Sequence, residues 1–368
     1  MTSTRRLTDP ADSPIAAPLI AWHADSGRHD LPWQTDRTLY RVWISEVMLQ
    51  QTQVATVRPY YERFTHHFPD VRALAAADVD EVLHLWSGLG YYARARNLHR
   101  AARVICAEHG GELPESFAGL AQLPGIGRST AGAILALSCG ARFPILDGNV
   151  RRVLSRYFGI AEAAGAAAVR RLWKLSERCT PAEHVAQYTQ AIMDLGATVC
   201  VRRRPLCECC PLKARCIAQR SGRQQEFPKA HAPRLRRLRR VFMVVALSEA
   251  GSVLLKRRPE SGVWGGLWCP PQFDSASAAR GFIRATFAAN GVEPRRLSVV
   301  EHAFTHFSLE ITPLLVHCPA GAAVMEEGTS LWYNLHTPLR VGLPAPISAL
   351  LGELADGSLF EPPAVMQR

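Results

Sequence analysis

The sequence is poor in lysine and has no long apolar stretch. Only four of its 43 basic residues are lysine, and none of them precedes Lys174. The longest apolar runs, such as residues 241–247, fall far short of the ~18 residues that a membrane span needs. The polar start at residues 1–6 is not followed by an apolar segment suited to export. These absences argue against a membrane or exported protein, and we expect a soluble, cytoplasmic chain.

The composition indicates a folded protein with a polyanionic partner. With 48% hydrophobic and 20% charged residues, the chain has enough apolar side chains to form cores. Its 368 residues suggest two domains or three, at about 150 residues per domain. The 43 basic residues exceed the 32 acidic ones and give a net charge of +11. A surplus weighted toward arginine favours a polyanion, and nucleic acid is the leading candidate.

Residues 18–223 are predicted to form a mostly α-helical domain. Residues 1–17 lack hydrophobic periodicity and are predicted to be a flexible tail. Helices are predicted near residues 19–23 and over residues 39–57, 78–85, 92–108, 129–138, 150–158, 166–179 and 184–195. Short turn signals, such as Leu31-Pro32 and Thr180-Pro181, separate these segments.

A basic segment followed by a change of period marks a second domain. Residues 224–240 form the predicted interdomain linker, with six cations and no acid between residues 229 and 240. Such a linker either crosses a phosphate backbone or is a solvated hinge, and the sequence favours neither. Within residues 241–368, strands are predicted over 241–247, 252–256, 304–316 and 330–333, and a helix over 277–290. The expected fold is a helical domain followed by a smaller α/β domain.

Four cysteines with the spacing C-x6-C-x2-C-x5-C lie within residues 200–216, namely Cys200, Cys207, Cys210 and Cys216. In a cytosolic chain this density indicates a metal or cluster site, because the cytosol keeps thiols reduced. Zinc and an iron-sulfur cluster both accept four thiolates, and the spacing alone does not separate them. Cys209 is an alternative ligand. The other five cysteines are scattered and are expected to be small buried residues.

A second motif, LPGIGRS at residues 123–129, lies between two predicted helices. Gly125 and Gly127 allow a sharp turn, after which the free amides of a helix N-terminus face outward. Amides in this position favour a phosphate, so the motif predicts a contact with a DNA backbone. The alternative is a generic corner between two helices, which becomes less convincing when Asp147 and the four cysteines follow.

Two acidic residues are the candidates for catalysis. Glu46 shares one face of its predicted helix with apolar groups and carboxamides. A carboxyl there should be desolvated, with a raised pKa that suits a general acid. With Asp147 it would form the pair that N-glycoside cleavage needs, one acid protonating the leaving base and the other stabilising a cationic sugar. The alternatives are an exposed glutamate, and an Asp147 or Asn149 that only caps the helix beginning near Val150.

The chain resembles the MutY-type adenine DNA glycosylases, which share the helix-hairpin-helix superfamily with endonuclease III. The resemblance is carried by WISEVMLQQTQV, GLGYYARARNL, LPGIGRSTAGAI, ILDGNVRRV and the four-cysteine pattern, and it resumes at VWGGLW (263–268) and HAFTHFSLEI (302–311). It implies a helix-hairpin-helix glycosylase domain over residues 18–223 and a Nudix-like domain over residues 241–368 that recognises 8-oxoguanine. The implied partner is double-stranded DNA with A:8-oxoguanine or A:G mispairs, bound by a monomer.

The resemblance also implies roles for individual residues. Glu46 would protonate adenine, Asp147 would stabilise the sugar cation, Asn149 would support the site, and the four cysteines would hold a [4Fe-4S] cluster. The implied DNA contacts are a wedge of Leu49 and Gln51, Tyr91 against the orphaned purine, Trp33 at the adenine pocket, and Phe304, Thr305, His306 and Ser308 at 8-oxoguanine. Core packing is the alternative for each of Leu49, Gln51, Tyr91 and Trp33, and it is strongest for Leu49 and Trp33. An ordinary strand is the alternative for residues 304–308. Gln34, where relatives carry arginine, receives no role.

The scarcity of lysine bears on strand cleavage. Bifunctional relatives use a lysine of the hairpin motif to form a Schiff base. The corresponding position here resembles Ser129, and the chain has no lysine before Lys174. We therefore expect a monofunctional glycosylase that leaves the abasic strand intact.

Two other functions compete with this interpretation. A Nudix-like domain could hydrolyse nucleotide pyrophosphates, but that reaction needs an acidic ladder to hold magnesium, and residues 279–290 contain no acid. We therefore reject hydrolysis by the second domain. The third interpretation is a DNA-binding protein that scans without catalysis, in which Glu46 is incidental.

Overall fold

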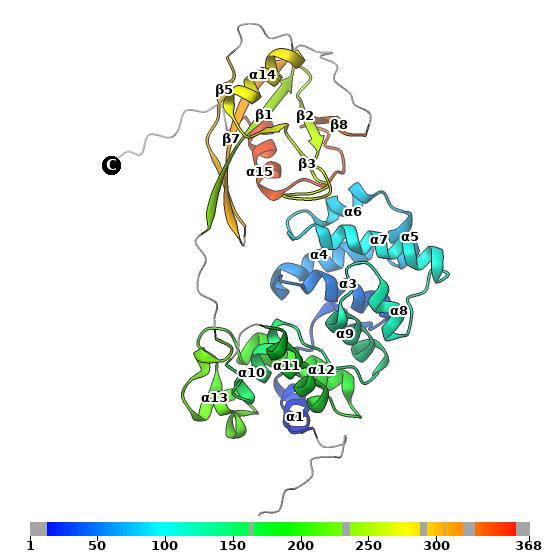
Figure 1. Ribbon diagram of the computed structural model, residues 1–368. Helices are drawn as coiled ribbons and strands as arrows, with labels where there is room; N and C mark the ends of the chain where they lie inside the picture. The colour runs from blue at the N-terminus through cyan, green and yellow to red at the C-terminus, as the bar shows by residue number, and fades with distance from the viewer. Residues whose placement is uncertain are drawn as a thin grey trace, which may run out of the picture. The chain divides into compact units, whose positions relative to one another are not determined.

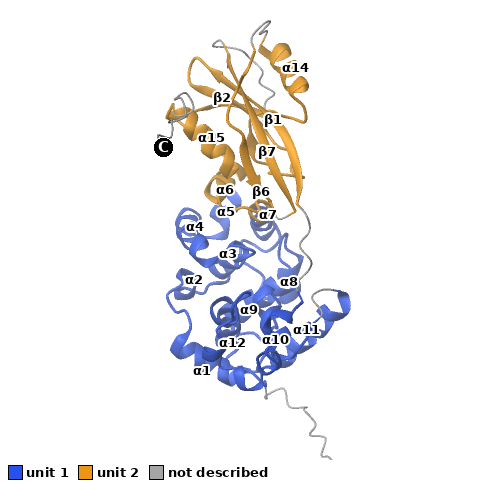
Figure 2. Cartoon of the chain, turned by 90° about the vertical axis from the view of Figure 1, so that its left-hand side faces the viewer, with its two compact units in different colours: residues 1–76, 97–232 blue, residues 77–96, 233–368 orange. Residues whose placement is uncertain are grey.

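The computed structural model describes residues 13–161, 165–229, 236–287, 293–304, 306–318 and 328–357. Figure 1 shows the order of its elements along the chain. The chain forms two compact units, which Figure 2 distinguishes by colour. Unit 1 comprises residues 1–76 and 97–232, and unit 2 comprises residues 77–96 and 233–368. Within the described ranges, no helix has the length and apolar character to span a membrane.

Unit 1 is built from helices. They are α1 (Ala16–Ser26), α2 (Pro32–Thr35), α3 (Leu39–Leu49), α4 (Val54–His67), α5 (Val71–Ala76), α8 (Phe117–Gln122), α9 (Arg128–Cys139), α10 (Gly148–Tyr157), α11 (Ala166–Cys179), α12 (Val185–Asp194) and α13 (Ile217–Arg220), with most of α7 (Ala93–Glu108). Short helical turns follow α12, namely η1 (Leu195–Val199), η2 (Cys207–Cys209), η3 (Lys213–Arg215) and η4 (Gln224–Glu226). The helical prediction for this part of the chain is confirmed.

One apolar core joins the helices that position the candidate site. Leu19 of α1, Leu154 of α10 and Ile192 of α12 are each 0% exposed within it. Burial of one such side chain contributes about 1.5–3 kcal/mol. Cys200 and Cys210 are partly buried and pack against the same core. The cysteine loop is therefore attached to the helix that begins at Asp147.

The predicted flexible tail over residues 1–17 is too long. Residues 1–12 lie outside the described ranges, but Ile15 is fully buried in the core of unit 1. The Ser13 hydroxyl donates to the Cys179 carbonyl at 2.6 Å and accepts the amide of Ala16 at 3.0 Å, which satisfies a free N–H at the start of α1. A single buried isoleucine among proline, alanine and serine makes no periodic pattern, so the sequence did not reveal this anchor.

The helix predicted over residues 39–57 is two helices, α3 and α4. Gln51 stands between them with a left-handed backbone at φ 60°. The Thr52 amide donates to the Leu49 carbonyl at 3.3 Å and closes the turn. Apolar residues continue at helical spacing on both sides, so periodicity could not show the interruption. The break leaves Gln51 exposed at the end of α3.

Unit 2 contains a mixed β-sheet. Its elements are α6 (Val79–Trp86), β1 (Arg237–Ser248), β2 (Ser252–Arg257), β3 (Trp268–Cys269), β4 (Gln272–Phe273), α14 (Ala276–Phe287), β5 (Arg295–Arg296), β6 (Val300–Ala303), β7 (Phe307–Cys318), β8 (Ser330–Asn334) and α15 (Ala345–Ala355). The central strands β1 and β7 are parallel and pair from Arg237 opposite Phe307 to Ser248 opposite Cys318. Ile283 of α14 packs with Val244 and Val316 in the core beside the sheet. The predicted α/β character is confirmed, although α15 was not predicted.

The division into units differs from the predicted boundary for residues 77–96, which belong to unit 2. Asp80 of α6 forms an ion pair with Arg257 and accepts the indole N–H of Trp268 at 3.1 Å. Leu83 lies so close to Gly342 that a Cβ on this glycine would be 2.6 Å away. These partners are far away in the sequence, so the local pattern of α6 predicts a helix but not the unit to which it belongs.

The linker between the units is also shorter than the predicted range, residues 224–240. At its start, Phe227 is buried and its carbonyl accepts a hydrogen bond from Arg156 at 3.1 Å. At its end, Arg237 already belongs to β1, and residues 230–235 lie outside the described ranges. Arg240 pairs with Glu310 at 3.2 Å and Arg239 with Asp274 at 3.6 Å. Part of the basic charge assigned to the linker is therefore offset by acids of unit 2.

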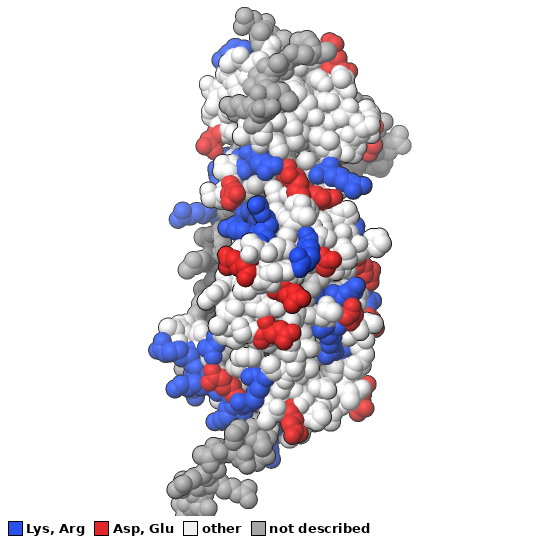
Figure 3. Space-filling model, turned by 90° about the vertical axis from the view of Figure 1, so that its right-hand side faces the viewer, with Lys and Arg blue, Asp and Glu red and all other residues white. Residues whose placement is uncertain are grey.

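On the face drawn in Figure 3, arginine and lysine lie interspersed with aspartate and glutamate. Close opposite charges offset one another, so the basic charge on this face is partly neutralised.

Candidate active site and cysteine loop

Glu46 lies in the middle of α3, a helix that packs against α9. Its neighbours Ser45 and Val47 are buried, and Glu46 itself is half-buried. Loss of hydration raises the pKa of the Glu46 carboxyl to about 8, and the negative charge of Asp147 adds to the rise. A pKa of about 8 keeps most of the Glu46 carboxyl protonated at neutral pH.

Asp147 is the N-cap of α10. Its carboxylate accepts the Val150 amide at 2.8 Å, so the alternative role predicted for it, a helix cap, is present. Burial raises the Asp147 pKa, while the amides of Val150 and Asn149 and the cation of Arg152 oppose the rise. Burial therefore raises the pKa of both carboxyl groups, and only at Asp147 do the amides of a helix N-terminus oppose the rise.

The hairpin motif is joined to the Asp147 segment. Gly125 needs its glycine, since it has φ 81° and a Cβ there would lie 2.8 Å from Cβ of Asn97. Gly127 is the N-cap of α9 at φ −91°, and a Cβ on it would meet open space. The Ser129 hydroxyl accepts the Leu146 amide at 2.9 Å. Ser129 therefore holds the chain one position before Asp147, a role that the sequence did not indicate.

The residues predicted as a DNA wedge lie at the end of α3. Gln51 is exposed in the turn after this helix, and Leu49 is half-buried. The neighbouring Gln50 carboxamide donates to the Thr130 hydroxyl of α9 at 3.3 Å. The turn that carries Gln51 is thus connected to the hairpin helix.

Trp33 and Gln34 lie in the short helix α2. Trp33 is buried, and its ring meets the Tyr61 ring edge-on, with the ring centroids 5.3 Å apart. Trp33 therefore packs in the core, which was the alternative to a role at the adenine pocket. Both polar atoms of the Gln34 carboxamide are buried without a hydrogen-bond partner among the described residues. Buried polar groups are nearly always satisfied, so an incoming polar group would find an available partner here.

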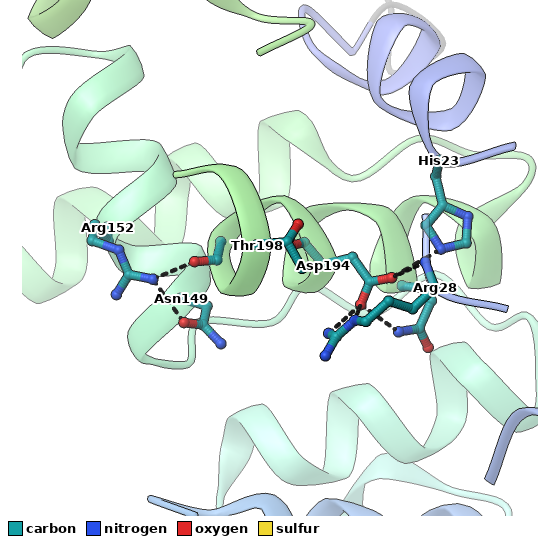
Figure 4. Close-up of polar contacts among 8 residues, drawn as sticks. His23, Arg28, Asn149, Arg152, Asp194 and Thr198 are labelled. Carbon is teal, nitrogen blue, oxygen red and sulfur yellow. Dashed lines mark hydrogen bonds and ion pairs between the residues drawn. The ribbon is translucent and has the colours of Figure 1, made fainter. Parts of the chain in front are cut away.

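Asn149 is held by a residue that sequence reasoning missed. Arg152 donates to the Asn149 side chain at 2.8 Å, as Figure 4 shows. It also donates to the Gly196 carbonyl at 2.5 Å and to the Cys200 carbonyl at 2.7 Å. Gly196 lies so close to α10 that a Cβ on it would be 2.6 Å from Cβ of Asn149. Arg152 stands inside the segment ILDGNVRRV, but its spacing from Asp147 does not reveal these partners.

A second buried cluster lies at the end of α12. Asp194 is fully buried and accepts from the Arg28 guanidinium at 2.5 Å, from the Arg28 amide at 2.9 Å and from Gln190 at 3.1 Å. His23 Nε2 lies 3.3 Å from its carboxylate, and Figure 4 shows the same grouping. Burial lowers the pKa of His23, and Asp194 opposes this shift. The cluster ties the chain before Trp33 to α12, and no sequence signal pointed to Asp194.

The four cysteines of the predicted site line one cavity. Its other lining residues include Arg156, whose guanidinium lies 3.4 Å from the Cys200 sulfur. Cys209 is exposed and does not border the cavity. Burial raises the pKa of Cys210 to about 12, with the other thiols adding to the rise. Within the described ranges, no three His, Cys, Asp or Glu side chains are placed to hold a single metal ion. Four soft donors beside a cation fit an anionic iron-sulfur centre.

The predicted recognition residues 304–308 lie in unit 2, between β6 and β7. His306 is exposed, Phe304 and Ser308 are half-buried, and Thr305 lies outside the described ranges. Tyr91 also belongs to unit 2, with 47% of its surface exposed and a left-handed backbone at φ 49°. Glu46 and Asp147 thus lie within electrostatic reach of each other in unit 1, whereas Tyr91, Phe304 and residues 306–308 belong to unit 2.

Comparison with known families gives two matches. Residues 44–178 match the family described as HhH-GPD superfamily base excision DNA repair protein. Residues 242–353 match the NUDIX domain family. The first match covers Glu46, the hairpin and Asp147, and the second covers residues 304–308.

Similar proteins are found among curated sequences and solved structures. An adenine DNA glycosylase from Buchnera aphidicola subsp. Acyrthosiphon pisum is 38% identical over 335 residues, which cover 90% of this chain and 95% of that protein. The human adenine DNA glycosylase is 43% identical over 219 residues, or 57% of this chain and 40% of that protein. The structure of a thermostable thymine-DNA glycosylase matches with a TM-score of 0.52 at 26% identity, covering 56% of this chain and 95% of that one.

Proposed function

The chain belongs to the adenine DNA glycosylases of the helix-hairpin-helix superfamily, and on this premise we propose that it removes adenine opposite 8-oxoguanine or guanine and leaves the strand uncut. As a DNA N-glycosylase of base excision repair, it hydrolyses the bond between adenine and deoxyribose. The observation that carries the proposal is the pair of Glu46 and Asp147, one carboxyl kept protonated by burial and the other fixed by the amides of a helix N-terminus.

The pair suits hydrolysis of an N-glycosidic bond. Protonation by Glu46 makes adenine a better leaving group, and the Asp147 carboxylate stabilises the positive sugar that forms as the bond breaks. Asn149, held by Arg152, supports the geometry at the first turn of α10. Because a duplex hides the bond, adenine has to leave the stack, at a cost of a few kcal/mol.

The proposed DNA contacts follow from exposure and local backbone. Gln51 at the end of α3 and Leu49 would fill the gap left by adenine, with Trp33 and the unsatisfied Gln34 carboxamide at the adenine pocket. The amides near Gly125, Gly127 and Ser129 would bind phosphate at the start of α9. In unit 2, Tyr91 would contact the orphaned purine.

Residues 304–308 are proposed to read the base opposite adenine. Oxidation of guanine at C8 adds a carbonyl and turns N7 from an acceptor into a donor. The exposed His306 and the Ser308 hydroxyl are groups that can distinguish these two edges. Hydrolysis by this unit is not proposed, because the sequence of α14 contains no acid that could hold magnesium.

The four cavity cysteines would hold the [4Fe-4S] cluster. When bound, such a cluster crosslinks its loop, so that binding free energy becomes folding free energy. Arg156 would stand beside it, since this guanidinium also donates to the Val201 carbonyl at 2.7 Å and to the Arg202 carbonyl at 3.1 Å. Cys209, exposed and outside the cavity, is not proposed as a ligand.

The test is single-turnover adenine release from duplexes with A:8-oxoguanine, A:G and A:T pairs. We expect release from the first two and none from A:T. Strand scission should appear only after alkali, because Ser129 cannot form a Schiff base. Equal release from all three duplexes would refute the mispair specificity. Covalent trapping on substrate DNA by borohydride, at the level of a true lyase, would refute the monofunctional assignment.

A further inference from the structure

Residues 258–267 of unit 2 form a tight turn between β2 and β3. The Arg258 amide donates to the Leu267 carbonyl at 2.8 Å and closes it. A Cβ on Gly265 would lie 2.0 Å from the Glu260 carbonyl oxygen, so only glycine fits there. Trp264 has φ 55°, a left-handed conformation that a bulky residue keeps only when its surroundings hold it. The turn is therefore a constrained structure and not a loose connection.

Arg96 binds this turn from the first part of α7. Its guanidinium donates to the carbonyls of Gly265 and Glu260, the second at 3.0 Å. Its Cδ passes 3.2 Å from the place where a Cβ on Gly266 would stand. A planar guanidinium that reaches two carbonyls sets the direction of the backbone, which a single ammonium does less well. Arg96 thus fastens the turn to the segment that carries Tyr91.

Trp264 connects the same turn to residues 304–308. Its buried ring contacts the rings of His302 and Phe304, each with centroids 5.7 Å away. Phe304 in turn stacks on Phe307 at 4.5 Å, and its amide donates to the Phe307 carbonyl at 2.9 Å. Aromatic pairs of this kind contribute about 0.5–1.5 kcal/mol each beyond the area they bury. The short segment that exposes His306 therefore rests on an aromatic base anchored at Trp264.

All of these contacts lie within unit 2, although residues 77–96 and residues 258–318 are far apart in the sequence. From them we infer that Arg96 and Trp264 are positioning residues, which set the placement of Phe304 and residues 306–308 relative to the Tyr91 segment for reading the base opposite adenine. The inference rests on the proposed recognition of 8-oxoguanine by residues 304–308. Neither residue is assigned a contact with DNA. Their effect is geometric, because a recognising group must be held within about 0.5 Å of its productive position.

The experiment compares single-turnover adenine release from A:8-oxoguanine and A:G duplexes in the full chain and its variants. Arg96→Gln should lower the ratio of the A:8-oxoguanine rate to the A:G rate by about tenfold, equivalent to about 1.4 kcal/mol. The A:G rate itself should stay within about twofold of that of the parent chain. The matched control is Arg100→Gln, an exposed arginine one turn later on α7, which removes the same charge. Its ratio should equal that of the parent chain.

Three outcomes separate the inference from the proposed function. If the parent chain shows no preference for 8-oxoguanine, or His306→Ala keeps the preference, the proposed recognition itself is wrong. If the parent prefers 8-oxoguanine and His306→Ala loses this preference while Arg96→Gln keeps it, the inference is overturned. If Arg96→Gln slows adenine release from both duplexes equally, and Arg100→Gln does the same, Arg96 acts as a general DNA contact and the inference is again overturned.

A second variant covers the case in which Arg96→Gln does not fold. Trp264→Phe keeps an aromatic ring at this position but a smaller one. It should lower the ratio of the A:8-oxoguanine rate to the A:G rate less than Arg96→Gln does. The double variant Arg96→Gln with Trp264→Phe should lower it by less than the product of the single effects, because both act through one turn. Multiplicative effects, or a Trp264→Phe ratio equal to that of the parent with unchanged Tm, would contradict the inference.

Discussion

Glu46 and Asp147 differ because their surroundings differ. Glu46 projects from the middle of a helix among buried neighbours, where the loss of hydration dominates its pKa. Burial also raises the pKa of Asp147, but this residue caps a helix, and the amides of Val150 and Asn149 oppose the rise. Burial therefore acts on both carboxyls, and helix amides oppose it only at Asp147.

The rate of adenine release should depend on pH through this pair. It should fall as the pH rises through about 8, where Glu46 loses its proton. The rate should also fall in acid. The midpoint of this fall should lie above 3.8, the ordinary pKa of aspartate, because burial raises the Asp147 pKa. Glu46→Gln should reduce release by about 10²–10⁴-fold while mispair binding persists. Single-turnover rates from pH 4 to 9 measure this, and undiminished release by Glu46→Gln would exclude Glu46 as the acid.

The same substitution should stabilise the fold in alkaline solution. The pKa of Glu46 in the folded chain is raised to about 8 from an ordinary 4.5. Its contribution to stability is therefore complete below pH 4.5 and is lost as the pH rises through about 8. Glutamine carries no such penalty, so the Tm of Glu46→Gln minus that of the parent should increase between pH 5 and pH 9. Thermal melts without DNA test this, and a difference that is independent of pH would contradict the raised pKa.

Sequence reasoning found the acids but not the residues that hold them. Glu46 could be predicted because helix geometry puts it among apolar neighbours, and Asp147 because it precedes a helix. Arg152 and Gly196 could not, because their contacts cross between α10 and η1. Such contacts depend on tertiary packing, which a local pattern does not contain.

At the scale of elements, the cysteine loop gives a prediction with an internal control. Cys210→Ser removes a thiol that lines the cavity, whereas Cys209→Ser changes an exposed neighbour outside it. Cys210→Ser should lose iron and sulfide and lower the Tm, because a crosslink of the loop is lost. Cys209→Ser should retain both at the level of the parent. Iron and sulfide analysis with thermal melts checks this, and an equal loss in both variants would show that Cys209 is a ligand.

Element boundaries were harder to predict than element types. The helices and the strand pattern follow from periodicity, but the interruption at Gln51 requires a backbone conformation that periodicity does not encode. The segment predicted as a strand from residue 304 begins as a strand only at Phe307, because the Phe304 amide closes a turn onto the Phe307 carbonyl. Both departures fall at segments proposed to contact DNA, where local rules commonly fail.

At the scale of the whole molecule, α6 depends on residues far along the chain. A chain ending at residue 229 would remove Arg257, Trp268 and Gly342, which contact Asp80 and Leu83. Residues 79–86 should then lose protection from hydrogen exchange, and the dye ANS should bind the uncovered apolar side chains. The control is a chain ending at residue 357, which should behave as the parent. Unchanged protection of residues 79–86 in the shorter chain would contradict this dependence.

The overall architecture was predictable to the level of two domains and their classes. Composition, periodicity and motif order indicated a helical part followed by an α/β part. The allocation of residues 77–96 was not predictable, because it rests on an ion pair and on close packing with residues more than halfway along the chain. The burial of Ile15 in the core of unit 1 was not predictable for a similar reason.

The membership of residues 77–96 in unit 2 has a consequence for exchange between relatives. A chimaera joined only within residues 230–236 would pair the α6 of one protein with the sheet of another, and would separate Arg96 from the turn to which it is bonded. The transferable module is discontinuous and has two crossover points in the first half of the chain, before residue 77 and after residue 96. Natural selection would therefore act on residues 77–96 together with residues 233–368, because both stretches belong to unit 2.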